Sequence, residues 1–564
     1  MVLGVITILH LFCGRNWATG VLLLQLFVSP LNAQEVTKVD HPQSTTEQTE
    51  QGFIQEWSVI RDDPKSSNYG KIQESVRLVF KALVCCLGTV LFFEIPVYPM
   101  ANGPPVTFPL VLLVLLLGGI FFTARLSFIN IRMFCHAVEI IRGRFDKSED
   151  EGEVSHFQAL TSALSATVGL GNIAGVAAAI AMGGPGAVFW MWVAAFLGMS
   201  MKFASCSMAQ YYRRVKLDGS ILGGPMVYLE DGIKDRFPRL SSLGVVLGKL
   251  YAIFTVFAAL GGGNIFQGNQ TFRIISGQID VPAEEAWVVG AIMAILVGMV
   301  IIGGIRRIGE VTGRLVPAMC AFYCFLCIAI IVCNIDRLGS TLSSILADAF
   351  NLDSGFGALI GIAILQGTRR ASFSNEAGFG TAAIAHAAAK TSEPFREGIV
   401  AMIEPFIDTI VVCTMTALSI LVTESHFDPV TCLPYAEGVS NEKGVELTAA
   451  AFSTLGVWAP KFLCIAVFVF AYSTMVSWCY YGERAIEYLL GERGIKPYQC
   501  AYVICVVIGP MLSFSTVIDF SDMMLFSMAF PNILGLIMLS GTISRGSRDY
   551  VRRLRSGEMK NSIS

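Results

Sequence analysis

Two stretches of this chain share one unusual pattern, a pair of glycines inside an otherwise apolar segment. The first, residues 165–175, reads SATVGLGNIAG, and the second, residues 374–383, reads SNEAGFGTAA. Glycine is a poor helix former, so each pair is expected to interrupt the helix that contains it. Paired interruptions in two halves of a membrane chain are typical of the binding sites of transporters. The pattern therefore predicts two broken helices whose freed backbone groups hold a substrate and a coupling ion.

The composition places most of the chain in a membrane. Of the 564 residues, 54% are hydrophobic and only 15% are charged, whereas a soluble domain has about 25% charged residues. The net charge is −3, and no basic cluster resembles a footprint for nucleic acid. We therefore expect a polytopic, all-α membrane protein with no nucleic-acid partner.

The N-terminal region differs from the rest. Residues 1–33 are expected to form a signal peptide, because Arg15 precedes the apolar run Val21–Val28 and small residues follow as far as Ala33. An uncleaved first helix is the alternative. Residues 34–105 are expected to form a polar extension outside the cytoplasm, in which Arg77–Pro99 suits an interfacial helix better than a span.

A membrane-spanning helix needs about 20 mostly apolar residues. Val106–Ala124 meets this condition, and Phe128–Ile141 is expected to be an amphipathic helix at the cytoplasmic surface, so that residues 106–155 form one unit. Ten further spans are expected near residues 157–182, 186–211, 243–276, 286–303, 314–333, 357–390, 398–422, 460–489, 498–513 and 516–541.

The two glycine patterns fall in the first and the sixth of these ten spans. Because this displacement is an odd number of helices, the two copies cross the bilayer in opposite directions, as in the inverted repeats of secondary transporters. We expect residues 156–333 to form the first five-helix repeat and residues 334–541 the second, with a basic cytoplasmic tail at 542–564. One additional transmembrane helix precedes the two repeats.

Charge in the loops predicts the orientation. Lysines and arginines gather at residues 125–147, 213–239, 306–314, 484–496 and 545–555, whereas residues 280–285 and 424–442 are acidic. Basic loops face the cytoplasm. We therefore expect a multi-pass protein of the plasma membrane, a bacterial inner membrane, with a cytoplasmic C-terminus and the N-terminal tail outside.

Each helix break would expose backbone groups, which survive at membrane depth only where they line a cavity or are buried in protein. The helical half after Gly171 would present amides to a carboxylate, and the half before Ser374–Gly380 would present carbonyls to an ammonium group or a cation. A zwitterionic amino acid meets both needs. The alternative is that Gly171 and Gly175 form a helix-packing motif, but two glycine breaks at equal offset favour the first interpretation.

Other polar side chains also lie in apolar segments. Asn264 and Gln267 share one helix face and are expected to contact a solute, with a link between helices as the alternative. Ser473 and Thr474 offer hydroxyl oxygens that suit a small hard cation, although such hydroxyls also bond within their own helix. Trp478 is either a wall of the pocket or part of the core.

Charges inside a membrane are rare and usually functional. We expect Glu376 to pair with Arg369 or Arg370 as a structural brace rather than to contact substrate, and Asp408 to have a similar role. His386 is expected to be a packing histidine rather than a proton relay.

With these residues in view, the chain resembles the alanine or glycine:cation symporter family, the sodium:alanine symporters, over roughly residues 106–541. The blocks that carry the resemblance are Phe157–Leu160, Val168–Ala177, Gly183–Trp190, Gly223–Met226, Gly304–Gly309, Phe373–Gly378, Ile384–Lys390, Phe406–Thr409 and Tyr480–Glu483. The resemblance implies the leucine-transporter (LeuT) type of fold, built from two inverted five-helix repeats. It also implies sodium-coupled uptake of alanine or glycine, as the L or D isomer.

The resemblance also implies site residues. The amino acid would be held by the residues of the two breaks and by four flanking side chains: Gly169, Gly171, Asn172, Asn264, Gln267, Phe373, Ser374, Gly378 and Trp478. Sodium would bind near Ala166, Gly169, Ser473 and Thr474. The chain departs from the family pattern at Arg370, at Gln270 and over Thr381–Ala383, which leaves substrate preference and ion choice open.

The sequence thus predicts a sodium-driven symporter that imports a small neutral amino acid and has no cofactor besides the co-transported Na⁺. The alternatives are a proton-coupled symporter in which Glu376 or His386 carries the proton, and a channel or sensor of the same fold. An enzyme is disfavoured because no Ser/His pair, paired aspartates or HExxH motif occurs among the spans. The expected partners are the amino acid, Na⁺ and the lipid bilayer, and the oligomeric state is left open.

Overall fold

The computed structural model describes residues 93–98, 106–145, 150–279, 281–350, 357–426 and 444–559. Backbone contacts divide the chain into residues 1–64 and 65–564, and every described residue belongs to the second unit. The expected signal peptide and most of the extension at 34–105 lie outside the described residues.

The first described element is a β-hairpin, where part of an interfacial helix and the start of a span were expected. β1 (Glu94–Tyr98) pairs antiparallel with β2 (Val106–Pro109), and α5 (Leu110–Arg125) follows directly. The predictions of a helix over residues 94–98 and of a span from Val106 are therefore wrong. Val106, Thr107 and Phe108 favour a strand, and the fixed ring of Pro109 suits the position just before a helix. Residues 77–92 lie outside the described part.

The surface helix predicted over Phe128–Ile141 is two helices, α6 (Ile129–Arg132) and α7 (Phe134–Ile141). Ser127 and Phe128, which precede α6, have φ values of 53° and 55°, so the backbone turns through the left-handed region between α5 and α6.

The first half of the bundle follows the predicted order. Its elements are α8 (His156–Thr167), η1 (Leu170–Asn172), α9 (Ala174–Gly183), α10 (Gly186–Tyr211), β3 (Arg214–Val215), β4 (Ile221–Leu222), α11 (Pro225–Val227), η2 (Tyr228–Gly232), α12 (Ile233–Arg236), η3 (Pro238–Leu240), α13 (Ser241–Leu260), η4 (Gly261–Ile265), α14 (Phe266–Ile279), η5 (Ala283–Glu285), α15 (Ala286–Ile301) and α16 (Gly304–Cys333). The strands β3 and β4 form a short antiparallel pair.

The second half is also helical. It consists of α17 (Ile335–Ala349), α18 (Gly357–Asn375), α19 (Ala382–His386), α20 (Pro394–Ala401), η6 (Phe406–Cys413), α21 (Thr414–Val422), α23 (Gly444–Ser453), α24 (Ala459–Leu490), η7 (Glu492–Gly494), α25 (Ile495–Ile508), η8 (Gly509–Met511), α26 (Phe514–Ser527) and α27 (Ala529–Arg555). The helices α17 and α23 were not predicted. The tail expected from residue 542 instead continues α27 as far as Arg555.

Seven helices of the described part are long and apolar enough to cross a membrane, and a bent pair, His156–Thr167 with Leu170–Gly183, brings the number to eight. Four of the eleven predicted spans do not meet that criterion as continuous helices, and one of these four, near residues 157–182, is the bent pair. The α5 and α25 helices have only 16 and 14 residues, and the predicted span 357–390 is interrupted between α18 and α19. The described part is thus a predominantly helical, multi-pass membrane protein.

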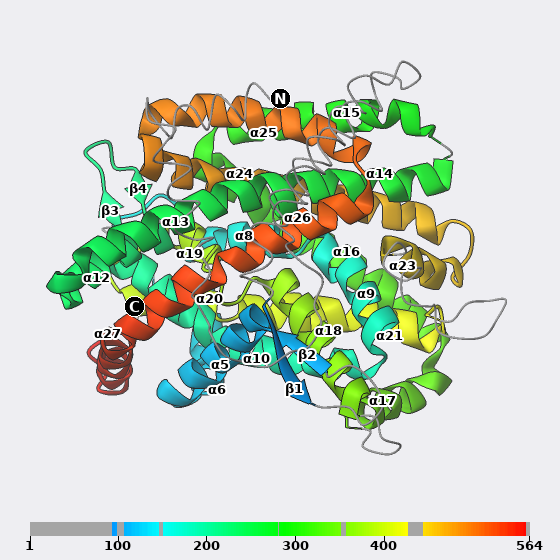
Figure 1. The fold of residues 1–564 in the computed structure, drawn as a ribbon, viewed down its shortest axis with the longest axis horizontal. Coiled ribbons are helices and arrows are strands. Elements are labelled where there is room, and N and C mark those ends of the chain that lie inside the picture. The colour runs from blue at the N-terminus through cyan, green and yellow to red at the C-terminus, as the bar shows by residue number, and fades with distance from the viewer. Residues whose placement is uncertain are drawn as a thin grey trace, which may run out of the picture. The chain divides into compact units, whose positions relative to one another are not determined.

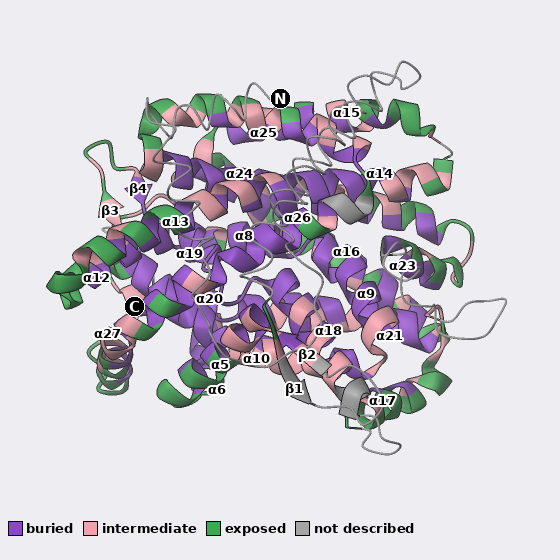
Figure 2. Ribbon diagram, viewed as in Figure 1, coloured by how far each residue is buried: buried purple, intermediate pink, exposed green. Residues whose placement is uncertain are grey.

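Burial separates the inner helices from the outer ones. The α8 helix packs against α16, α24 and α19 (Figure 1), and Figure 2 shows it buried along most of its length. The α15 and α16 helices instead expose large apolar side chains, among them Trp287, Ile292, Ile295, Phe325 and Val332. An apolar surface of this kind suits contact with lipid rather than water, so the broken helix lies inside the bundle and away from lipid.

Candidate functional site

The first glycine pattern breaks its helix as predicted. The α8 helix ends at Thr167, and the two halves meet at an angle of 58°. The amide N–H of Gly169 donates to the side-chain oxygen of Asn172 at 2.9 Å, so this side chain replaces a lost helical bond inside the break. A Cβ on Gly169 would lie 2.6 Å from Oγ1 of Thr474, so only glycine allows α24 to approach this closely.

The second glycine pattern also breaks its helix. The α18 helix ends at Asn375, and α19 begins at Ala382. Between them the chain has φ values of 53° at Glu376, 93° at Gly378 and 83° at Gly380. Left-handed backbone is unfavourable for most residues and readily adopted by glycine, which explains the two glycines. For Glu376 such a conformation stores local strain, a feature that concentrates at functional sites.

One buried carboxylate joins the two breaks. The Asn172 amide donates to Oδ1 of Asp408 at 2.6 Å, and the Ser374 hydroxyl donates to Oδ2 at 2.8 Å. The Thr409 hydroxyl donates to the same Oδ2, also at 2.8 Å. Asp408 lies in the π-helical turn η6, so a third segment holds the breaks together. From the sequence, Asp408 was expected to be part of a structural brace, and its position between the two breaks was not predicted.

The two breaks also touch directly. A Cβ on Gly171 would lie 3.2 Å from Cα of Ser374 and 3.4 Å from the Phe373 ring. A Cβ on Gly175 would meet nothing within 4 Å apart from its own helix. A helix-packing motif requires close contact at both glycines, so the packing interpretation of Gly171 and Gly175 is wrong.

A small cavity lies at the first break. About 10 Å³ of it is accessible to the centre of a water-sized sphere, which is roughly the space that one water molecule needs. Ten residues line it: Ala166, Thr167, Gly169, Gly171, Gly262, Gln267, Phe373, Glu376, Trp478 and Leu525. Six of these, namely Ala166, Gly169, Gly171, Gln267, Phe373 and Trp478, are among the site residues predicted from the sequence.

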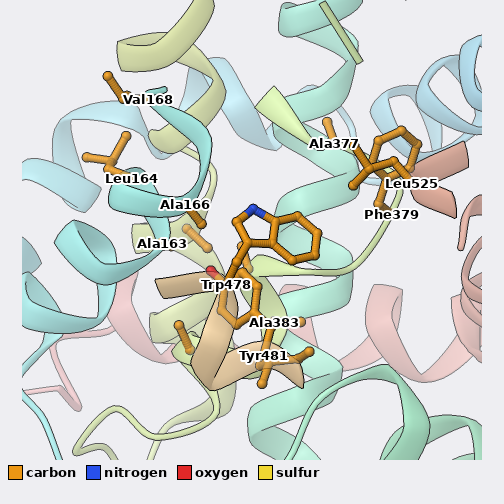
Figure 3. Close-up of a cluster of buried hydrophobic side chains, with 14 of the residues drawn as sticks. Ala163, Leu164, Ala166, Val168, Ala377, Phe379, Ala383, Trp478, Tyr481 and Leu525 are labelled. Carbon is orange, nitrogen blue, oxygen red and sulfur yellow. The ribbon is translucent and has the colours of Figure 1, made fainter. Parts of the chain in front are cut away.

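Trp478 forms one wall of this cavity. Figure 3 shows its indole ring between Ala163 and Ala166 on one side and Phe379 and Leu525 on the other. A Cβ on Gly263 would fall 2.3 Å from the indole, so the glycines of η4 let the ring lie against the backbone. Gln267 follows η4, and its amide donates to the Gly262 carbonyl at 2.9 Å. Its Oε1 is buried without a hydrogen-bond partner among the described residues.

Four other residues that were predicted to bind the amino acid do not line this cavity. Asn172 and Ser374 face Asp408, and the amide of Asn264 donates to the Tyr502 carbonyl at 2.8 Å. A Cβ on Gly378 would lie 2.4 Å from Cδ2 of Leu115, so this glycine packs against α5. None of these four is among the residues that line the cavity.

The predicted ion residues on α24, Ser473 and Thr474, lie beside the last turn of α8. The Thr474 hydroxyl donates to the Ser165 carbonyl at 3.0 Å, and the Ser165 hydroxyl donates to the Ser473 carbonyl at 2.7 Å. The Ser473 hydroxyl donates within its own helix, to Phe470, at 2.9 Å. The last turn of α8 and the middle of α24 are therefore fastened together beside the first break.

Glu376 is the lining residue whose role was predicted wrongly. Its carboxylate accepts hydrogen bonds from Trp478 Nε1 at 3.2 Å and from the Thr381 hydroxyl at 2.5 Å. Arg369 instead pairs with Asp522 at 2.6 Å, and Arg370 lies 3.7 Å from the same carboxylate. The helix ends just before Glu376 and the backbone turns there, so its side chain points to α24 and not back along α18.

His386 belongs to a buried polar cluster elsewhere in the bundle. Its Nδ1 lies 2.5 Å from Oε1 of Glu397, and His156 bonds to the other oxygen of the same carboxylate. Nearby, Lys202 pairs with Glu404 at 2.8 Å. None of these residues lines the cavity. The cluster joins the start of α8 to the end of α19, and within it His386 is buried and hydrogen-bonded to a carboxylate.

The chain matches known proteins over the same region. Residues 99–564 match the model of the Sodium:alanine symporter family. The sodium/alanine symporter AgcS of Methanococcus maripaludis is 42% identical over 451 residues, which are 80% of this chain and 96% of that protein. The amino-acid carrier protein AlsT of Bacillus subtilis is 34% identical, covering 78% of this chain and 89% of its own length. The probable sodium/glutamine symporter GlnT of the same organism is 33% identical, covering 79% and 89%.

These matches extend over most of the chain and confirm the resemblance on which the sequence prediction rests. The proteins that they name are transporters and not enzymes, and the family's name implies Na⁺ as the co-transported ion. This multi-pass membrane chain belongs to the sodium:alanine symporter family.

Proposed function

We propose that this protein imports a small neutral amino acid, alanine or glycine, together with Na⁺. The observation that carries the proposal is the convergence of both helix breaks on Asp408, with a cavity beside them. Two broken helices in contact supply amide and carbonyl groups without helical partners, and these groups can bind a zwitterion and a cation together. An inward-negative potential of 100 mV supplies roughly 2.3 kcal/mol for each positive charge that enters.

In this proposal the amino acid lies between the breaks. Its carboxylate meets the backbone of Gly169–Asn172, at the start of the helical half that α9 continues, where the helix dipole favours an anion. Its ammonium group meets the end of α18 near Ser374 and Gly378. Phe373 and Trp478 wall the pocket, Gln267 offers its unpaired Oε1, and Asn264 holds η4 in place.

Glu376 completes this arrangement as the counter-charge of the ammonium group. It lines the cavity, is 3% exposed, and accepts hydrogen bonds from two neutral donors, Trp478 and Thr381. No lysine or arginine of the described part forms a salt bridge with it. A buried carboxylate without a cation is unfavourable by several kcal/mol, so an arriving ammonium group gains much of its binding energy there.

Sodium occupies the space between the end of α8 and the middle of α24. Its ligands are the carbonyls of Ala166 and Gly169 and the hydroxyls of Ser473 and Thr474. The contact between Thr474 and Ser165 and the close approach of Gly169 support this placement, because they bring hard oxygen atoms from both helices together. Binding of Na⁺ would thus fix the shape of the first break, on which the amino acid also depends.

The size of the cavity supports a small substrate. With about 10 Å³ open to a water-sized sphere, and with two aromatic walls, the site must widen to admit alanine. Movement of the breaks would supply that widening during alternating access, in which one repeat rocks against the other.

We further propose that the fold is the LeuT type. Residues 156–333 and 334–541 form its two inverted five-helix repeats, preceded by α5 as an additional helix. The signal peptide at 1–33 and the extension at 34–105 precede the unit 106–155, and the basic end at 542–564 is cytoplasmic. The two helix breaks, each near the start of its repeat, support this arrangement.

Uptake by proteoliposomes tests the coupling ion. Initial rates of labelled alanine uptake are measured at fixed pH with external Na⁺ and with choline in its place. We expect alanine uptake only when external Na⁺ is present. Equal rates in choline that rise with an imposed proton gradient would establish proton coupling instead.

A further inference from the structure

A cleft bordered by basic residues lies apart from the two breaks, and it shares no lining residue with the cavity at the first break. Its volume is about 480 Å³, and it opens between the turn that joins α5 to α6 and the last turns of α27. The α27 helix, which runs to the C-terminal end of the described chain, packs against α5 (Figure 1). The lining residues are Arg125, Leu126, Ser127, Ile129, Arg132, Ser544, Ser547, Arg548, Val551, Arg552 and Arg555. They include five arginines and three serines but no acidic residue.

Four of the five cleft arginines lack the carboxylate partners that other arginines of the described part have. Arg214 pairs with Asp231 at 2.7 Å, and Arg553 pairs with Glu393 at 2.6 Å. Within the described residues, only one arginine of the cleft, Arg552, forms a salt bridge, with Asp549 at 2.6 Å.

The hydrogen bonds of the remaining arginines leave their charge uncompensated. Arg132 donates to the Ser127 carbonyl at 3.3 Å, and Arg548 donates to the Ser544 carbonyl at 3.1 Å. Arg125 and Arg555 form no salt bridge with a described residue. Like charges gathered around one cleft repel one another, so the arrangement favours a bound anion.

The cleft borders an apolar surface. Phe128, in the turn before α6, is 50% exposed, and Ile131, on α6, is 62% exposed. Further along α5, Leu117, Ile120 and Phe121 are exposed as well. Large exposed apolar side chains of a membrane protein face lipid. The cleft therefore lies at the depth where lipid headgroups join their acyl chains. This continuity favours a lipid over a free ion.

We propose that this cleft binds the phosphate of an anionic membrane lipid. Guanidinium groups pair with phosphate oxygens through two parallel hydrogen bonds, which a single ammonium cannot do. The hydroxyls of Ser127, Ser544 and Ser547 add neutral donors. Basic pockets between transmembrane helices on the cytoplasmic side suit anionic headgroups in this way. The bound lipid would hold α5 to the C-terminal helix.

Native mass spectrometry of the purified full-length protein tests the site, with phosphatidylglycerol as the probe and phosphatidylcholine as the zwitterionic comparison. The triple variant Arg125→Gln, Arg548→Gln, Arg555→Gln removes charge from the cleft. The matched control is Arg236→Gln, Arg239→Gln, Arg493→Gln, which removes the same charge from exposed arginines elsewhere. Gel filtration confirms that both variants remain folded.

The expected result is that the cleft variant binds phosphatidylglycerol roughly a hundredfold more weakly than the control, since each arginine near a membrane surface contributes about 1 kcal/mol. Phosphatidylcholine should bind both variants equally. Equal binding of phosphatidylglycerol to both variants would overturn the site. Displacement of phosphatidylglycerol by an equal concentration of inorganic phosphate would overturn the assignment to a lipid. Neither outcome depends on transport.

Discussion

The side-chain amide of Asn172 donates to the carboxylate of Asp408 over 2.6 Å, and this bond links the first helix break to the segment that also holds the second. The second break reaches the other oxygen of the same carboxylate through Ser374. The two breaks therefore share one acceptor. A movement of either break changes the hydrogen bonding of the other, which is the property that coupled binding of two solutes requires.

Replacing Asp408 with asparagine should uncouple the breaks. Asn172 and Ser374 donate to different oxygens of the carboxylate, and the amide keeps an acceptor at only one of these two positions. A hydrogen bond to a charged group contributes about 1.5–3 kcal/mol, so we expect alanine uptake to fall at least roughly tenfold. Uptake is measured per inserted protein. The control, Asp336→Asn on the exposed side of α17, should transport normally; normal uptake by Asp408→Asn would show that the shared carboxylate is dispensable.

The glycines offer a comparison within one segment. Gly171→Val should abolish uptake with the protein still inserted, because its side chain would collide with Ser374 and Phe373. Gly175→Ala, one helical turn later, should transport normally because nothing surrounds that position within 4 Å. Labelled alanine uptake and surface labelling measure both variants. If Gly171→Val transports and Gly175→Ala does not, the first break is not the site.

Gly378→Val provides a second test on the other break. The residue has a φ of 93°, and a Cβ there would lie 2.4 Å from Leu115. A β-branched residue adopts left-handed backbone poorly, so uptake should again be lost. Retained membrane insertion distinguishes a lost site from a lost fold.

Glu376→Gln tests the counter-charge of the ammonium group. Loss of a charge-assisted hydrogen bond should raise the apparent KM for alanine roughly 10- to 100-fold. Glu376→Asp keeps the charge on a shorter side chain, so its apparent KM for alanine should lie between the values for Glu376→Gln and the wild type. The control is Glu310→Gln, which changes an exposed glutamate of α16. An unchanged KM for alanine in Glu376→Gln would remove this carboxylate from the binding site.

Thr474→Val tests the sodium ligands. Valine keeps the shape but has no oxygen, so the Na⁺ concentration for half-maximal uptake should rise about tenfold or more. Thr474→Ser keeps a hydroxyl, so its Na⁺ concentration for half-maximal uptake should stay near the wild-type value. The measurement is uptake of alanine across a series of Na⁺ concentrations at constant ionic strength. The same half-maximal Na⁺ concentration in the wild type and in Thr474→Val would place the ion elsewhere.

The sequence was informative wherever the signal was local. The glycine pairs predicted both breaks, because glycine acts on its own stretch of backbone, and apolar runs located α10, α15 and α24 within a few residues. Partners distant in sequence were not predictable. Glu376 and Arg369 are near each other in the chain, yet the end of α18 sends them to Trp478 and Asp522.

The hairpin and the polar cluster show the same limit. Residues 106–109 are apolar enough for a span, but their β-branched and aromatic side chains and Pro109 form a strand paired with residues 94–98. His156, His386 and Glu397 come from three helices, so no spacing in the sequence identifies them as a group. The position of Asp408 between the breaks is the most important feature that was not predicted, because it depends on two breaks meeting in space.

Concentrative uptake is the most direct test of sodium-coupled symport through this pair of breaks. Proteoliposomes with an inward Na⁺ gradient are given labelled alanine at equal concentrations inside and outside, and its internal concentration is followed over time. Sodium-coupled symport should accumulate alanine well above the external concentration, and this accumulation should collapse when an ionophore dissipates the Na⁺ gradient. An internal concentration that never exceeds the external one would show passive passage, as through a channel, and would contradict it.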